Sequence, residues 1–397
     1  EAVAAAEDGQ TVTLLADATE DVVISKSITL DLGGKTLTNT NAGKATISVT
    51  SGTVTVKNGN VVGGNDYYNI EAKKDANLTL TDVTATAGNN GSSMIDNYGT
   101  LTITSGTYTG GMNTVKSEEG SVLNISGGTF TCDFGKKWSY TAVILVYGTT
   151  TITGGEFIQK TTNTSSYAKV VMTGKVDGYE AFTKVTGGTF TNEKLSGIFY
   201  GLGNATADNF EVSGGTFNKY VSDSYMAEGF IPVKNANGTY GVKAGKFVAE
   251  VGSTKYETLA EAVAAAEDGQ TITLLCDVAD CSSLTISKNI TLDGGGHTIS
   301  GNSSISVNMP GNAAADVTIK NVNFKDIANG NKLSAFYFSQ VKGKLTITGC
   351  TFDSIEYEAI QVTPMEGAEV NVSNNVFKAK ADGTQVRHIH MSCYRSL

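Results

Sequence analysis

Asp133, Lys160 and Glu193 come nearest to an acid–base arrangement among the charged residues of this chain, because each lies three positions after a Phe of a repeated phrase. If the repeated units stack, two steps of about 4.8 Å separate the two acids by about 10 Å. That is near the upper end of the carboxyl separation in an inverting glycosidase. The intervening Lys160 instead favours a surface charge ladder, whose ion pairs are worth under about 1 kcal/mol each. We therefore expect a charge ladder and assign no catalytic residue.

Aromatic residues cluster in the long intervals that follow Phe130 and the next two phrases. Loops that project from a stiff scaffold are where recognition usually lies, and exposed rings can stack on sugar faces or anchor a protein partner. The alternative is that these rings fold back and cover their own coils. The candidate ligand contacts are Trp138, which is the only Trp, and Tyr140, Tyr167 and Tyr179.

The cysteines and histidines give one candidate crosslink and no metal site. Cys276 and Cys281 flank a two-residue expansion of a duplicated segment, and we expect a local disulfide between them in an exported protein. His388, His390 and Cys393 lack a fourth ligand, so we expect no zinc site and no cofactor.

The residues above lie between or after copies of a repeated eight-residue pattern. This repeated phrase reads apolar-x-apolar-x-turn-turn-x-apolar and recurs along the chain. LTITSGTY, residues 101–108, is one example. Its first and third residues are apolar, which predicts a short strand with one buried face. Its fifth position is usually Gly, Asn or Asp, which tolerate a left-handed turn. The eighth position falls at Leu37, Val61, Ala85, Tyr108, Phe130, Phe157, Phe190, Phe217, Ile299, Phe324, Phe352 and Phe377.

A repeat of this length is typical of solenoids, in which each unit buries its apolar face only against its neighbours. A second β-rich run, such as Ala142 to Val146, often precedes the phrase, so each unit holds at least two strands. Stacked in one direction, like residues align into interior columns of Leu, Ile, Val and Phe. The pattern predicts an all-β chain folded as a parallel β-helix.

A duplication divides the chain into two domains. Residues 1–10, EAVAAAEDGQ, recur at 261–270, which predicts domains at 1–244 and 245–397. We expect the first domain to lack its opening strand and to end in a hairpin cap near 229–242. We expect the second to carry a capping helix at about 257–267 and to be C-terminally incomplete, so the natural protein should be longer in both directions.

The composition of the chain restricts the classes of partner that it can bind. The chain has 397 residues, of which 46 are Gly, 3 are Pro and 17% are charged, and its net charge is −10. This acidity leaves no basic stripe for nucleic acid or anionic lipid. No apolar run approaches the roughly 18 residues needed to span a bilayer, so we expect no membrane insertion in this segment. We expect a monomer.

The phrases ISGGTF, ITGGEF, VTGGTF and VSGGTF, at 125–130, 152–157, 185–190 and 212–217, resemble repeats of large surface proteins of gut bacteria. LDLGGKTL at 30–37 and LDGGGHTI at 292–299 are similar to the first-coil motif of pectate-lyase-like right-handed β-helix proteins. The resemblance implies a right-handed β-helix, secretion and display on the bacterial cell surface.

The same resemblance raises an enzymatic alternative. Lyases of that superfamily use an arginine base beside calcium-binding aspartates, and the hydrolases use clustered aspartates. Here the only arginines are Arg387 and Arg395, in an aberrant tail, and no Asp-Asp pair occurs. We therefore expect an adhesin or stalk that binds a glycan or a host or matrix surface without catalysis. The alternatives are a polysaccharide-active lyase or glycoside hydrolase, and a purely structural spacer.

Overall fold

The computed structural model describes the chain as two compact units, Glu1–Ala244 and Gly245–Leu397. Each is considered by itself. The described residues are 1–39, 41, 43–64, 67–87, 91–135, 140–161, 168–194, 197–279, 281, 283–301, 304–308, 313–327, 334–378 and 387–392.

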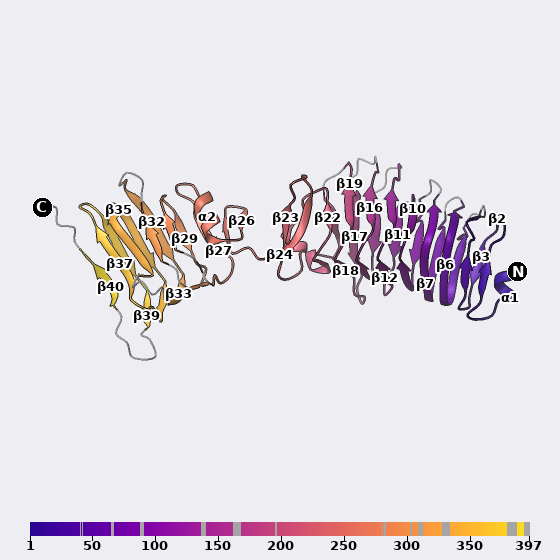
Figure 1. The fold of residues 1–397 in the computed structure, drawn as a ribbon, viewed down its shortest axis with the longest axis horizontal. Coiled ribbons are helices and arrows are strands. Elements are labelled where there is room, and N and C mark those ends of the chain that lie inside the picture. Colours follow the sequence, from indigo (N-terminus) through magenta and orange to yellow (C-terminus); the bar gives the residue numbers. More distant parts are fainter. Residues whose placement is uncertain are drawn as a thin grey trace. The chain divides into compact units, whose positions relative to one another are not determined.

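The first unit is built from coils whose strands stack in parallel on those of the next coil (Figure 1). The long strands β6 (Ile47–Val62) and β7 (Ile70–Thr86) each run through all three sheets of the unit. The first sheet also contains β3 (Val22–Ile24), β8 (Ile95–Asn97), β11 (Asn113–Ser117), β14 (Thr141–Val146), β17 (Ala168–Lys175) and β20 (Phe199–Gly203).

The other two sheets come from the repeated phrase, whose first half forms a strand of the second sheet and whose end forms one of the third. The second sheet contains β1 (Thr11–Thr13), β4 (Thr29–Asp31), β9 (Thr100–Ile103), β12 (Val122–Ile125), β15 (Thr149–Ile152), β18 (Phe182–Val185) and β21 (Phe210–Val212). The third contains β2 (Ala18–Thr19), β5 (Thr36–Thr38), β10 (Gly106–Thr109), β13 (Thr129–Cys132), β16 (Glu156–Gln159), β19 (Thr189–Asn192) and β22 (Thr216–Phe217).

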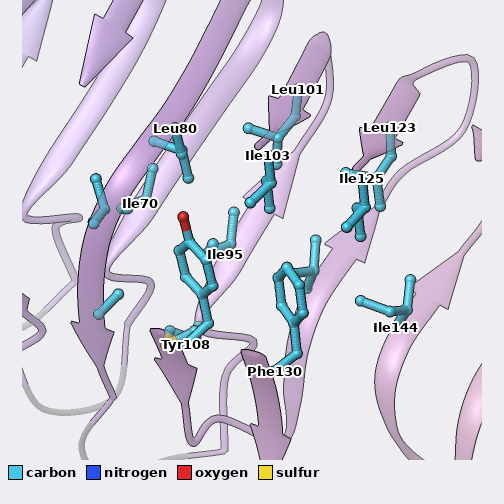
Figure 2. Packing of buried hydrophobic residues seen from close by; sticks show 14 of the residues in the cluster. Ile70, Leu80, Ile95, Leu101, Ile103, Tyr108, Leu123, Ile125, Phe130 and Ile144 are labelled. Atoms are coloured by element: carbon cyan, nitrogen blue, oxygen red, sulfur yellow. The ribbon is translucent and has the colours of Figure 1, made fainter. Parts of the chain in front are cut away.

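The core of the first unit consists of the predicted columns. Tyr108, Phe130 and Phe157 are fully buried, with ring centroids 4.9 and 5.0 Å apart in the order given. Figure 2 shows the Tyr108 and Phe130 rings side by side, beneath Leu and Ile side chains from neighbouring strands. Burial of such side chains contributes roughly 1.5 to 3 kcal/mol each.

The turn of the phrase differs from the expectation in the Gly-Gly units. Asn58 and Asp82, at the fifth position, have positive φ angles of 58° and 53°, as predicted. At Gly127-Gly128 and Gly154-Gly155 the positive φ falls on the sixth residue instead, at 99° for Gly128 and 107° for Gly155. Only glycine adopts that backbone readily, so the second glycine of the pair forms the corner.

Short helices and a hairpin lie at the ends of the first unit. Helix α1 (Ala2–Ala5) precedes β1. After β22, the strands β23 (Phe230–Lys234) and β24 (Tyr240–Ala244) form an antiparallel hairpin, and β24 pairs with β22. The single-turn helices η1 (Ala207–Asn209) and η2 (Asp223–Tyr225) lie in the last coils.

The second unit repeats this plan. Its second sheet contains β25 (Ala249–Val251), β26 (Thr254–Tyr256), β27 (Thr271–Leu274), β29 (Thr291–Asp293), β32 (Ala315–Lys320), β35 (Gly343–Thr348) and β38 (Glu369–Ser373). Its first sheet contains β28 (Leu284–Ile286), β31 (Ile305–Val307), β34 (Phe336–Val341), β37 (Glu358–Pro364) and β40 (Arg387–Met391). Its third contains β30 (Thr298–Gly301), β33 (Asn323–Ile327), β36 (Thr351–Asp353) and β39 (Val376–Lys378).

Helix α2 (Leu259–Ala265) is shorter than the predicted 257–267. It begins late because Thr258 and Glu261 form a capping box, and it ends at Ala265 because Ala266 is extended. Leu259 and Ala262 are buried against the core of this unit.

The sequence suggested that the C-terminal tail breaks the repeat, but part of the tail continues it. Strand β40 pairs in parallel with β37 and places Ile389 beside Ile360. The predicted all-β, right-handed parallel β-helix is confirmed. No helix in the described part of the chain is both long and apolar enough to cross a membrane.

Candidate functional site

The first sheet of unit one carries two columns of outward-facing residues formed by successive coils. The first column follows from strand register, which pairs Glu71 with Asp96, Asp96 with Lys116, and Lys116 with Leu145. The second column consists of the residues two positions further along each coil, namely Lys73, Tyr98, Glu118 and Tyr147. Three successive coils thus each contribute an acidic residue, and these residues lie beside lysines and tyrosines.

Asp96 is the least usual member of these columns. Its side chain is fully buried, and neither carboxylate oxygen has a hydrogen-bond partner of normal geometry. Burial, followed by the negative charge of Glu118, raises the pKa of Asp96 from 3.8 to about 7. Tyr68 and Tyr98 lie close to this carboxyl, and burial together with the charge of Asp96 raises the pKa of both phenols. An unsatisfied buried carboxyl of this kind requires an explanation.

The other two carboxylates have partners of their own. Glu71 forms an ion pair with Lys73 and accepts a hydrogen bond from Ser48 Oγ at 3.2 Å. Glu118 forms an ion pair with Lys116. Burial lowers the pKa of Lys116, but its hydrogen bond to Glu118 and the negative charges of Glu118 and Asp96 together outweigh that effect, so the net shift of the pKa is upward.

Two of the tyrosines hold lysine ammonium groups over their rings. Lys73 Nζ lies 5.6 Å from the centroid of the Tyr98 ring, and Lys116 Nζ lies 5.6 Å from that of Tyr147. Both distances are within the range of cation–π attraction. On this surface, the ammonium groups of Lys73 and Lys116 thus each contact both an aromatic ring and a carboxylate.

Tyr147 is positioned by a glycine on the next coil. A Cβ on Gly174 would meet Tyr147 Cε1 at 2.4 Å, so the ring lies directly over the glycine backbone. Beyond it the sheet is apolar, because Leu145 and Met172 pack with Tyr200 and Leu202 outside the main core. The surface thus has a charged end and an apolar, aromatic end.

A groove of about 290 Å³ follows this surface. Tyr68, Lys116 and Tyr147 line it on the sheet side, and Tyr140 lines it from the loop before β14. Tyr140 and Tyr98 have 38% and 37% of their surface exposed, so both rings are accessible to a ligand. The lining offers flat aromatic faces, a cation and hydroxyl groups in one depression.

The sequence-predicted aromatic residues are only partly assembled here. Tyr140 lies in the groove. Tyr179 is half exposed, lies against Gly120 and does not line the groove. Trp138 and Tyr167 lie outside the described residues.

Asp133, Lys160 and Glu193 lie away from the groove on the coils after the third sheet. Lys160 Nζ is 3.9 Å from Glu193 Oε1, and Asp133 is exposed. Lys160 and Glu193 thus form one step of the expected charge ladder.

Cys276 and Cys281 are not bonded to each other in this structure, and the disulfide between them stays a prediction. Cys281 is buried in the core of unit two, whereas the Cys276 thiol faces the Phe247 carbonyl oxygen at 3.7 Å.

Over the described ranges, no group of three or more His, Cys, Asp or Glu residues has an arrangement that would hold a metal ion. His390 is engaged with Glu358, whose Oε1 lies 3.1 Å from His390 Nδ1, and Cys393 lies outside the described residues.

A larger hollow, of about 480 Å³, lies beside α2 in unit two. Its charged residues, Lys246, Glu257 and Asp277, are all exposed. Solvated charges of this kind are common on protein surfaces, so the groove over Asp96 is the stronger candidate.

Sequence reasoning missed the Glu71–Asp96–Lys116 column because the turns between strands vary in length. Glu71 lies seven positions before Leu78, Asp96 five before Leu101, and Lys116 seven before Leu123. Aligning the coils on the repeated phrase therefore places Asp96 out of register with its true neighbours. An alignment that allowed the turn to shorten would have brought the charges together.

Strand pairing defines the chain as a parallel β-helix protein. No family model matches it, and no curated protein matches it. A solved structure of a mutant of the PL6-family alginate lyase AlyGC is similar, with 12% identity, 95% of this chain and 87% of that chain covered, and a TM-score of 0.21. So low a TM-score carries no argument about activity.

Proposed function

We propose that this chain belongs to an extracellular, cell-surface bacterial protein whose first unit binds a glycan in the groove over Asp96. The observation that carries the proposal is the combination of Tyr68, Tyr140 and Tyr147 with Lys116 in one depression, beside the buried carboxyl of Asp96. Aromatic faces stack on sugar rings, and the charged and hydroxyl groups bond to sugar hydroxyls. The rigid solenoid holds these groups in place before the ligand arrives, which reduces the entropic cost of binding.

The geometry favours binding over turnover. A glycosidase of the common type needs a second free carboxyl group beside Asp96. Glu71 and Glu118 are also buried, and each is held by a lysine. The enzymatic and spacer alternatives are therefore outcomes of the test.

The test is a glycan array probed with the full chain and with Tyr147→Ala. We expect the wild-type chain to bind a defined set of glycans and Tyr147→Ala to bind them about tenfold more weakly, because truncating a central aromatic contact costs about 1 kcal/mol or more. Tyr179→Ala is the matched control, since that ring lies outside the groove.

If the chain bound neither a glycan on the array nor a host-cell surface, the proposal would be contradicted and a structural spacer would be favoured. Release of new reducing ends or unsaturated sugars from a bound glycan would establish an enzyme instead. Equal loss of binding in Tyr147→Ala and Tyr179→Ala would place the ligand elsewhere.

A further inference from the structure

The carboxylates of the two columns beside the groove outnumber the cations of those columns. Glu71 is paired with Lys73 and Glu118 with Lys116, which leaves the buried carboxyl of Asp96 without an ion pair of its own and with the Tyr68 and Tyr98 phenols as neighbours. A fully buried carboxylate without a partner is costly, and it becomes favourable only when a cation or a set of hydrogen-bond donors meets it. The unliganded protein therefore holds an acceptor that a ligand can satisfy.

The surrounding groups select the kind of cation. No metal-binding cluster occurs among the described residues, and the two neighbouring carboxylates are already engaged. An ammonium group needs fewer acceptors than a divalent metal, and the nearby Tyr98 and Tyr147 rings each already face one lysine ammonium. The local chemistry thus suits one further ammonium.

We propose that the groove selects glycans that carry a free amino group, with the ligand ammonium bound to Asp96 between the phenol oxygens of Tyr68 and Tyr98. This inference rests on the proposed glycan-binding function and names its substrate class. The chain's net charge of −10 and the three carboxyls of the site disfavour uronate-containing glycans.

Access to Asp96 requires a movement of one side chain. Tyr98 lies beside the carboxyl and is 37% exposed, so we infer that its side chain is the one that moves. Glu71, Lys73, Lys116 and Glu118 face the same carboxyl from the neighbouring coils, and the two ion pairs keep these four charges balanced as the ligand enters.

The experiment compares glycans that share a backbone and differ only in one substituent: a free amine, an N-acetylated amine or a hydroxyl. Oligouronates complete the panel. Binding of the full chain is measured by titration at fixed pH and salt. We expect the amine form to bind at least about tenfold more tightly than the matched hydroxyl form, because an ion pair with a buried partner is worth more than a surface pair.

Asp96→Asn should remove this preference while leaving binding of the hydroxyl form intact, since it keeps the shape and removes the charge. Glu211→Gln, which removes one charge on the second sheet, is the matched control and should keep the preference. Tyr98→Phe keeps the ring and should weaken the preference for the amine form alone.

Equal binding of the three matched forms, tighter binding of oligouronates, or an Asp96→Asn variant with an undiminished amine preference would overturn the inference and leave the glycan-binding function standing. Binding of lysine-rich peptides with no bound glycan would overturn both, as would no binding at all.

Discussion

Asp96 makes the stability of the first unit depend on pH. Its pKa lies near 7 in the folded chain and near 3.8 in the unfolded chain, so over that interval the folded state holds a proton that the unfolded state has lost. Stability therefore falls as pH rises from about 4 to about 7, with a slope of up to about 1.4 kcal/mol per pH unit. Below this interval the contribution of Asp96 is constant.

We predict that Asp96→Asn removes this part of the pH dependence and makes the chain more stable than wild type at pH 8. Urea unfolding of both chains from pH 4 to pH 8 measures the effect, and Asp133→Asn, at an exposed position, serves as the control. If the stability difference between Asp96→Asn and wild type stayed constant over this range, Asp96 would not be a buried carboxyl with a raised pKa.

At the scale of elements, the repeat depends on glycine corners. Gly155 has a φ of 107°, and a Cβ there would lie 3.1 Å from the Gly128 carbonyl oxygen and 3.2 Å from Phe157 Cζ. We predict that Gly155→Ala destabilises the first unit by about 1 to 3 kcal/mol, because it combines backbone strain with crowding of the ring column. Thermal unfolding followed by circular dichroism measures this.

Gly135→Ala is the matched control, since that glycine has no positive φ and a Cβ added to it would have no other atom within 4 Å. It should leave the melting temperature unchanged. A Gly155→Ala chain that melted with the control would show that the corner accepts an ordinary residue.

The phrase predicted the elements that repeat strictly. Leu101 and Ile103 point inward and Tyr108 joins the ring column because residues at fixed spacing must recur at the same place in each coil. The first sheet was less predictable, since the chain reaches it through turns of unequal length. For the same reason the repeat pattern alone does not place Asp96 beside Glu71, although strand register pairs the two residues.

The aromatic residues of the loops were predicted as ligand contacts from composition, and of the two that the structure describes, Tyr140 lines the groove and Tyr179 does not. The tyrosines that dominate the site, Tyr68, Tyr98 and Tyr147, lie next to strands of the first sheet instead. Their role depends on contacts between coils, such as the ring of Tyr147 over Gly174, which no single repeat contains.

On the scale of the whole molecule, the two units share a fold and differ in their surfaces. The outward column of the first sheet in unit two runs through Thr285, Ser306, Tyr337, Gln361 and His390. It contains no carboxylate, and Thr285 and Ser306 are within hydrogen-bond distance of each other, at 3.2 Å. The same scaffold thus carries a charged column on the first sheet of unit one and a column without carboxylates on the first sheet of unit two, which favours ligand binding by the first unit.

The most direct measurement is a crystal structure of the full chain with the glycan that binds it best on the array. The account predicts a sugar ring against Tyr98 or Tyr147 in the groove of unit one, with a polar ligand group directed at Asp96. Ligand density over unit two, or over the coils that carry Lys160 and Glu193 with the groove empty, would contradict it.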